Sequence, residues 1–170
     1  MNIFAIEGVG NEIDWEASAR SQDNLRVNKM ILESCQMLCT VLNAQHGFQV
    51  APFKSCHHKH PSTLWASASS DNWAALATHC EEMIAEFSRR FRRPHKCQSV
   101  LDRCADIFDP SRFDLSASTP LPLCMPEEYK GRTIVDSYRR YYASKPNIRY
   151  PKDCVPQWFH EYRTLPYIVC

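Results

Sequence analysis

Two long stretches of this chain, residues 11–46 and 62–93, contain neither glycine nor proline. The whole chain has only 4 glycines, whereas tight β-hairpin turns depend on glycine. Long stretches without these residues favour helices over hairpins. The sequence therefore predicts an all-α, or nearly all-α, fold.

Apolar residues recur at helical spacing in four parts of the chain. Asp23 or Asn24 can cap the first helix, and Pro94 ends the second. The four predicted helices cover residues 24–43, 62–92, 95–108 and 133–144. We therefore expect an irregular bundle of about four main helices with long loops, one of which, 109–131, holds four prolines.

The two ends of the chain are expected to be less regular. Residues 1–6 are predicted to form a short strand or an extended arm. The tail that follows Pro146 is predicted to be irregular and to pack over the helices. Its aromatic residues are Tyr150, Trp158, Phe159, Tyr162 and Tyr167.

Length and composition indicate one soluble domain over residues 1–170. Hydrophobic residues make up 44% and charged residues 23%, as in ordinary globular proteins. No apolar run approaches the ~18 residues of a membrane span, and the first ten residues lack the basic region of a secretory signal. Nine scattered cysteines form no C-x-x-C pair, so most are expected to be reduced and buried. We therefore expect a cytoplasmic protein with no membrane contact.

Three histidines and a cysteine lie within five residues, Cys56 to His60, directly before Pro61. His57 and His60 can transfer protons near neutral pH or contact phosphate. In the helix that follows, Trp65 and Asn72 are candidates for base contacts. The alternative roles are a histidine-rich surface loop and core packing. A zinc site here would need about four ligands, and no second ligand pair follows at an obvious spacing; we predict no metal and no cofactor.

Lys29, Glu33 and Gln36 lie on one face of the first predicted helix. A lysine beside a glutamate can act as a nucleophile with an acid–base partner. Gln36 could contact the hydrogen-bonding edge of a base. The alternative is a solvated helix face with one weak ion pair.

Two basic clusters indicate a polyanion-binding surface although the net charge is only +1. The first, residues 88–96, offers Arg90, His95 and Lys96 for phosphate contacts, whereas its arginines could equally offset the helix dipole. The second combines aromatic and basic side chains, which suits an unstacked nucleotide. Its candidate substrate-binding residues are Tyr138, Arg139, Tyr142 and Lys145. Core tyrosines with basic neighbours would have the same sequence.

Several motifs in this order resemble a family of small, largely uncharacterised bacteriophage proteins over most of residues 1–160. They are K-x-x-x-E-x-x-Q from Lys29, H-x-x-H-P-x-x-x-W from His57, N-W at Asn72, E-F-x-x-R-F-x-x-x-H-K from Glu86, M-P at Met125 and Y-R-x-Y-Y-x-x-K from Tyr138. The order and spacing of the helices are also similar to the pyrimidine-dimer DNA glycosylases of the phage endonuclease V class.

The glycosylase resemblance implies a compact helical hydrolase that binds duplex DNA, extrudes a nucleotide and cleaves an N-glycosidic bond. Those enzymes use the amine exposed by removal of Met1, with a glutamate beside it. Here Asn2 departs from the small residue that permits this removal. Glu33 best matches the acidic partner, and Lys29 could replace the amine.

We therefore predict a phage-type enzyme that acts on a damaged or modified pyrimidine in DNA, most simply by glycosidic cleavage. Glu33, Lys29, His57 and His60 are the predicted catalytic residues. One alternative is the transfer of a group onto a modified base or nucleotide, as in DNA hypermodification. Another is a module without catalysis that binds nucleic acid or a nucleotide, or that inhibits a host defence.

Overall fold

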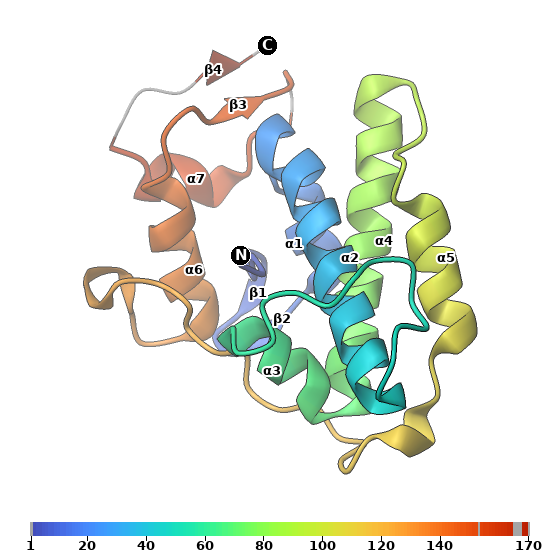
Figure 1. Cartoon of the computed structure of the whole chain (residues 1–170). Helices are drawn as coiled ribbons and strands as arrows, with labels where there is room; N and C mark the ends of the chain where they lie inside the picture. Colours follow the sequence, from blue (N-terminus) through green and yellow to red (C-terminus); the bar gives the residue numbers. More distant parts are fainter. Residues whose placement is uncertain (1, 153, 165–167, 170) are drawn as a thin grey trace.

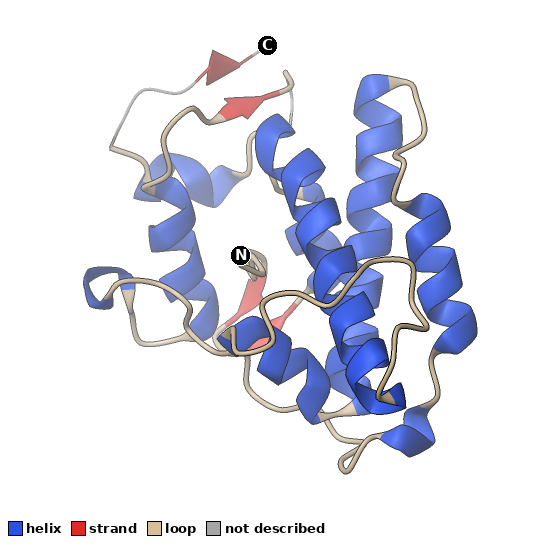
Figure 2. Ribbon diagram, viewed as in Figure 1, coloured by secondary structure: helices blue, strands red, loops and turns tan. Residues whose placement is uncertain are grey.

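The computed structural model describes residues 2–152, 154–164, 168 and 169. The described part is mainly helical, and its strands are only two residues long (Figure 2). The α-helices are α1 (Trp15–Arg20), α2 (Asn24–His46), α3 (Pro61–Ala68), α4 (Ser70–Phe91), α5 (Gln98–Ile107), α6 (Ile134–Ala143) and α7 (Gln157–Tyr162). Two 3₁₀ helices, η1 (Pro110–Arg112) and η2 (Glu127–Tyr129), lie between α5 and α6. The predicted all-α fold class is confirmed.

Helix α2 lies in the middle of the molecule, with α4 and α5 on one side and α6 and α7 on the other (Figure 1). It packs directly against α3, α4 and α5, and α1 packs on α4. Buried residues occur on most sides of α2, among them Val27, Ile31, Leu38 and Leu42. A helix that is enclosed in this way forms the centre of the core.

The N-terminal segment is an extended arm, one of the two predicted forms, and it runs through the core. Residues 2–6 are buried, and the backbone N–H groups of Ile6 and Glu7 donate to the Ser18 hydroxyl at 3.1 and 2.9 Å. The chain then makes a small antiparallel pair, β1 (Gly8–Val9) with β2 (Glu12–Ile13), before α1. The second pair, β3 (Arg149–Tyr150) with β4 (Ile168–Val169), is parallel.

The start of α2 is fixed by a buried polar cluster. Asp23 is the N-cap of α2 and accepts hydrogen bonds from the Tyr142 hydroxyl at 2.7 Å and from Arg26 at 3.0 Å. The Asp23 N–H in turn donates to the Tyr142 oxygen at 2.7 Å. Because these buried groups form hydrogen bonds with one another, they join the start of α2 firmly to α6.

The structure corrects three parts of the predicted helix pattern. The predicted helix 62–92 is two helices, because Ser69 has an extended backbone and its hydroxyl caps α4 by accepting from the Asn72 N–H at 3.1 Å. Helix α1, capped by Asp14, was not predicted. The tail is not wholly irregular, because it contains α7. The remaining predicted helices differ from α2, α5 and α6 only at their ends.

The aromatic tail packs on the helices as predicted. Tyr150, Trp158 and Phe159 are buried, and Tyr162 packs against the core. Tyr167 lies outside the described residues. No helix in the described part of the chain is long and apolar enough to cross a membrane.

Most of the cysteines are buried and reduced, as predicted. Five lie in the core between α2, α4 and α5, namely Cys35, Cys39, Cys80, Cys97 and Cys104. Three further reduced cysteines are half-buried: Cys56, Cys124 and Cys154. Cys170 lies outside the described residues. The buried thiols act as small apolar groups. Hydrogen bonds with Cys80 and Cys39 respectively, and then burial, raise the pKa of Cys35 and of Cys104.

Acidification is expected to destabilise the fold through His79. Its Nδ1 lies 2.8 Å from the Trp15 carbonyl and its Nε2 3.1 Å from the Gln22 amide, and burial lowers its pKa to about 4. Because the unfolded chain binds a proton near pH 6.5, this stabilisation is complete above that pH and is lost as the pH falls toward 4, by roughly 3 kcal/mol. Urea unfolding at several pH values, with a His79→Gln variant, measures the effect. An unchanged pH dependence in the variant would rule His79 out as its source.

Candidate functional site

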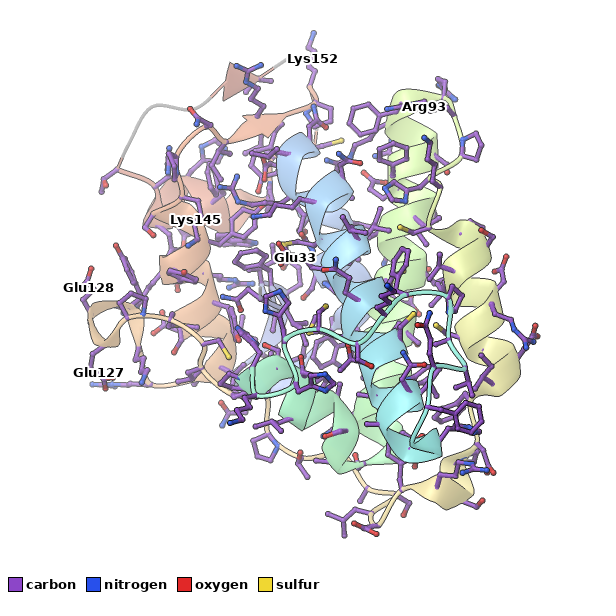
Figure 3. All side chains as sticks on the ribbon, viewed as in Figure 1. Glu33, Arg93, Glu127, Glu128, Lys145 and Lys152 are labelled. Atoms are coloured by element: carbon purple, nitrogen blue, oxygen red, sulfur yellow. The ribbon has the colours of Figure 1, made fainter. Side chains whose placement is uncertain are left out.

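The predicted Lys29–Glu33 pair lines a cavity of about 250 Å³ between α2 and α6. Glu33 and Lys145 lie on α2 and just beyond α6, on either side of this space (Figure 3). The N-terminal arm and the first turns of α2 supply the other walls. The lining residues are Asn2, Phe4, Leu25, Arg26, Lys29, Met30, Glu33, Tyr141 and Lys145.

The charged groups of this cavity, which we call the Glu33 pocket, are close together. The Lys29 Nζ lies 3.4 Å from Glu33 Oε1, with the lysine side chain 63% exposed and the glutamate side chain 14% exposed. The Lys145 ammonium lies 3.3 Å from the centre of the Tyr141 ring. The pocket thus combines a shielded carboxylate with two lysines and a tyrosine ring, which can bind an anionic ligand and move a proton.

The histidine-rich loop lies against α2. The Thr40 hydroxyl accepts from the Cys56 N–H at 3.1 Å, and the Asn43 amide donates to the Phe53 carbonyl at 2.9 Å. His60 caps α3, with its Nδ1 accepting from the Ser62 N–H at 3.2 Å. In the neutral ring the proton is therefore on Nε2.

His60 is electrostatically linked to the Glu33 pocket although it does not line it. Partial burial and the charge of His57 lower the pKa of His60, whereas the Glu33 carboxylate acts in the opposite direction. His57 itself is exposed in the turn before His60. Gln36 is half-buried one turn beyond Glu33 and is also outside the pocket lining. The structure thus brings Lys29, Glu33 and Lys145 into one pocket. It leaves His57, His60 and Gln36 outside the lining of that pocket.

His95 and Lys96 line a second cavity, of about 570 Å³, which borders the same face of α2. The two cavities share Leu25 and Lys29. Partial burial and the charge of Arg93 lower the pKa of His95. The first basic cluster therefore lies next to the Glu33 pocket, although the sequence separates them by about 60 residues.

Four predicted substrate-binding residues are core residues instead. Trp65 donates to the Thr119 carbonyl at 2.9 Å, and Asn72 donates to Thr119 and to the Trp65 carbonyl. The Tyr138 hydroxyl donates to the Pro122 carbonyl at 2.7 Å, and Tyr142 belongs to the Asp23 cluster. All four are buried with their polar groups bonded inside the protein, which gives them a structural role in place of the predicted substrate contact.

Two predicted phosphate-binding arginines are also held by the protein. The Arg90 side chain is only 3% exposed, bonds Glu86 at 2.5 Å and donates to the Gln22 carbonyl at 2.7 Å. Arg139 donates to the Ile6 carbonyl at 2.8 Å and pairs with Glu7 at 3.2 Å. Their donors are used to join secondary-structure elements, so they are not directed at a ligand.

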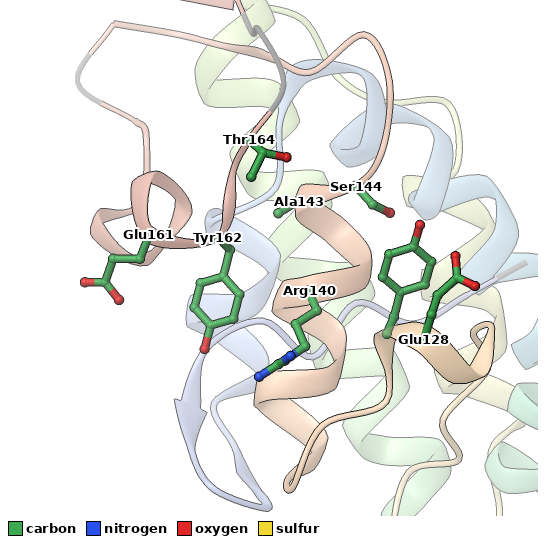
Figure 4. A pocket seen from close by; sticks show the side chains of 8 residues that line it. Glu128, Arg140, Ala143, Ser144, Glu161, Tyr162 and Thr164 are labelled. Atoms are coloured by element: carbon green, nitrogen blue, oxygen red, sulfur yellow. The ribbon is translucent and has the colours of Figure 1, made fainter.

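A cavity of about 560 Å³ on the far side of α6 is a weaker candidate site. Figure 4 shows Arg140 and Tyr162 in this cavity and Glu161 pointing away from them. The Arg140 Nε and the Tyr162 hydroxyl both bond the Asp136 carboxylate, at 3.0 and 2.9 Å. Since these groups are hydrogen-bonded to one another, the cavity offers few hydrogen-bonding groups to a polar ligand.

The sequence did not identify Asn2, Phe4 or Tyr141 as site residues. Nothing near residue 2 marks it as a neighbour of Glu33, because the contact comes from the path of the arm through the core. For Tyr141 a signal was present, because it lies four residues before Lys145, a spacing at which side chains near a helix end can meet. Met1, whose amine the glycosylase resemblance concerns, lies outside the described residues.

Comparisons with known proteins add no identification. No family model matches the chain, and no curated protein or solved structure is significantly similar to it. Within the described residues, no group of three His, Cys, Asp or Glu side chains is arranged to hold a metal ion.

Proposed function

We propose that this protein is a DNA-processing enzyme that acts on a damaged or modified pyrimidine, by cleavage of its N-glycosidic bond. The observation that carries the proposal is the Glu33 pocket, in which a shielded carboxylate pairs with Lys29 and shares one cavity with Lys145. The resemblance to the phage DNA glycosylases supports DNA as the substrate, and the resemblance to phage proteins supports the cytoplasm of an infected cell as the location.

Glu33 serves as the base of the reaction. Its carboxylate takes a proton from a water molecule as the water oxygen bonds the sugar C1′, and the bond to the base breaks with its electron pair leaving on the base. A carboxylate that is 14% exposed is shielded enough to hold such a water in place.

Lys29 stabilises charge in this proposal and is not the nucleophile. A nucleophilic amine has to be deprotonated, which requires a dry pocket or a second cation beside it. Lys29 is 63% exposed and paired with a carboxylate, so it has neither of these features. Lys29 and Lys145 then hold the phosphates on either side of the sugar, and the Tyr141 ring, 3.3 Å from the Lys145 ammonium, helps to position that lysine.

Mass spectrometry after incubation with phage and host DNA, including ultraviolet-damaged and hypermodified DNA, tests this function. The proposal predicts a released base whose yield depends on Glu33. A nucleoside of altered mass without a released base would show group transfer instead. Tight binding with no chemical change in any DNA would show a binding module without catalysis.

A further inference from the structure

The second cavity, which we call the flanking cavity, has an apolar wall that faces solvent. Leu25 and Leu32 are 48% and 44% exposed on the outer face of α2, and the edge of Phe87 completes the wall. Exposed leucines indicate a contact surface when they line one cavity. The volume of about 570 Å³ is that of a small-molecule site.

Another part of the lining of the flanking cavity is positively charged. Arg93, His95 and Lys96 come from the short segment between α4 and α5, and no carboxylate is among the described residues that line the cavity. Within the described part of the chain, neither Arg93 nor Lys96 forms an ion pair. Unlike Arg90, these two side chains are therefore available to an anion.

The position of His95 adds a hydrogen-bond donor. Its Nδ1 accepts from the Cys97 N–H at 3.1 Å, so the proton of the neutral ring is on Nε2. The ring meets Phe87 edge-on at 4.7 Å, and the Arg93 guanidinium lies 5.4 Å from the centre of the same Phe87 ring. An apolar surface beside two cations that are in no ion pair, together with an N–H donor, matches a flat base joined to a phosphate.

Lys29 connects the two cavities. It lines both of them, and its ammonium lies 3.4 Å from the Glu33 carboxylate. A phosphate bound by Lys29 would therefore join a sugar in the Glu33 pocket to a nucleotide in the flanking cavity. A ligand that fills both cavities therefore continues along α2 beyond the reacting nucleotide.

We propose that the flanking cavity binds the nucleotide adjacent to the reacting one in the same strand. Its base lies against Leu25 and Leu32, and its phosphate is held by Arg93 and Lys96. This inference rests on the proposed function and narrows it, because the substrate is then a strand of at least two nucleotides and not a free nucleotide.

Binding of thymidine 5′-monophosphate, the dinucleotide pTpT and a thymidine hexanucleotide tests this site. We expect pTpT to bind at least tenfold more tightly than the mononucleotide. In an Arg93→Ala/Lys96→Ala variant, that gain should disappear while mononucleotide affinity stays unchanged. An Arg103→Ala/Arg112→Ala variant is the control, since it removes the same charge from exposed side chains that line neither cavity.

Equal affinity of the mononucleotide and pTpT would overturn the inference and leave the Glu33 pocket as a single-nucleotide site. A gain that persists in the Arg93→Ala/Lys96→Ala variant would also overturn it. A Leu32→Ala variant supplies a separate check, because this exposed side chain contributes to the apolar wall and is expected to weaken only pTpT and the hexanucleotide. If none of the three ligands binds, the proposed function fails together with the inference.

Discussion

A Glu33→Gln variant is expected to lose at least about 100-fold of its base-releasing activity while it keeps its fold and its affinity for DNA. Removal of a positioned general base typically slows a reaction 10²–10⁴-fold. Glutamine has the same shape, so the walls of the pocket are retained, but it cannot take a proton from water. The rate of base release under single-turnover conditions measures this effect.

The matched control for Glu33 is Glu81→Gln. Glu81 is an exposed residue of α4 that lines neither the Glu33 pocket nor the flanking cavity. This variant should retain full activity. Retained activity in Glu33→Gln, with DNA binding intact, would contradict the role of Glu33 as the base.

An Arg90→Ala variant is expected to lower the free energy of unfolding by about 3–5 kcal/mol, because removal of one partner of a buried ion pair leaves the remaining groups unsatisfied. For a domain of this size, that loss corresponds to a fall in Tm of roughly 10 °C. Arg90 bridges Glu86 to the carbonyls of Gln22 and Arg20, and so joins α4 to the end of α1. Thermal unfolding followed by circular dichroism measures the change.

The pKa of Glu86 is consistent with this structural role. Burial acts to raise the pKa of this carboxyl, but hydrogen bonds from Arg89 and Arg90 outweigh burial and hold the pKa below its ordinary value. An Arg103→Ala variant, which removes an exposed surface charge, should leave Tm nearly unchanged. An Arg90→Ala variant of normal stability but with weakened DNA binding would return Arg90 to the phosphate-binding role.

The main helices could be predicted from sequence because their apolar spacing is regular and their caps are recognisable. The division of residues 62–92 into two helices was not predicted, because the helical spacing of apolar residues continues across Ser69. Serine is nevertheless a good N-cap residue. Helices α1 and α7 have only six residues each, too few to show a periodic pattern. Their helical form depends on packing against α4 and α6.

Only those contacts of the site that join residues close together in the sequence could be predicted. Lys29 and Glu33 are one turn apart, so their pairing follows from helix geometry, whereas the approach of Lys145 depends on how α6 packs beside α2. Tyr142 and Arg90 could not be assigned from residue type alone, because basic and aromatic residues occur both in binding surfaces and in the core. For Arg90 the spacing to Glu86 was a usable sign of an internal ion pair.

The central claim is that DNA binds in the Glu33 pocket, between α2 and α6. The most direct test is the affinity of a fluorescent pyrimidine oligonucleotide for a Lys29→Ala/Lys145→Ala variant, measured by anisotropy at several salt concentrations. We predict at least a tenfold weaker affinity and a shallower salt dependence than in the wild type, with the Arg103→Ala/Arg112→Ala control unchanged. Wild-type affinity and salt dependence in the Lys29→Ala/Lys145→Ala variant would contradict the claim.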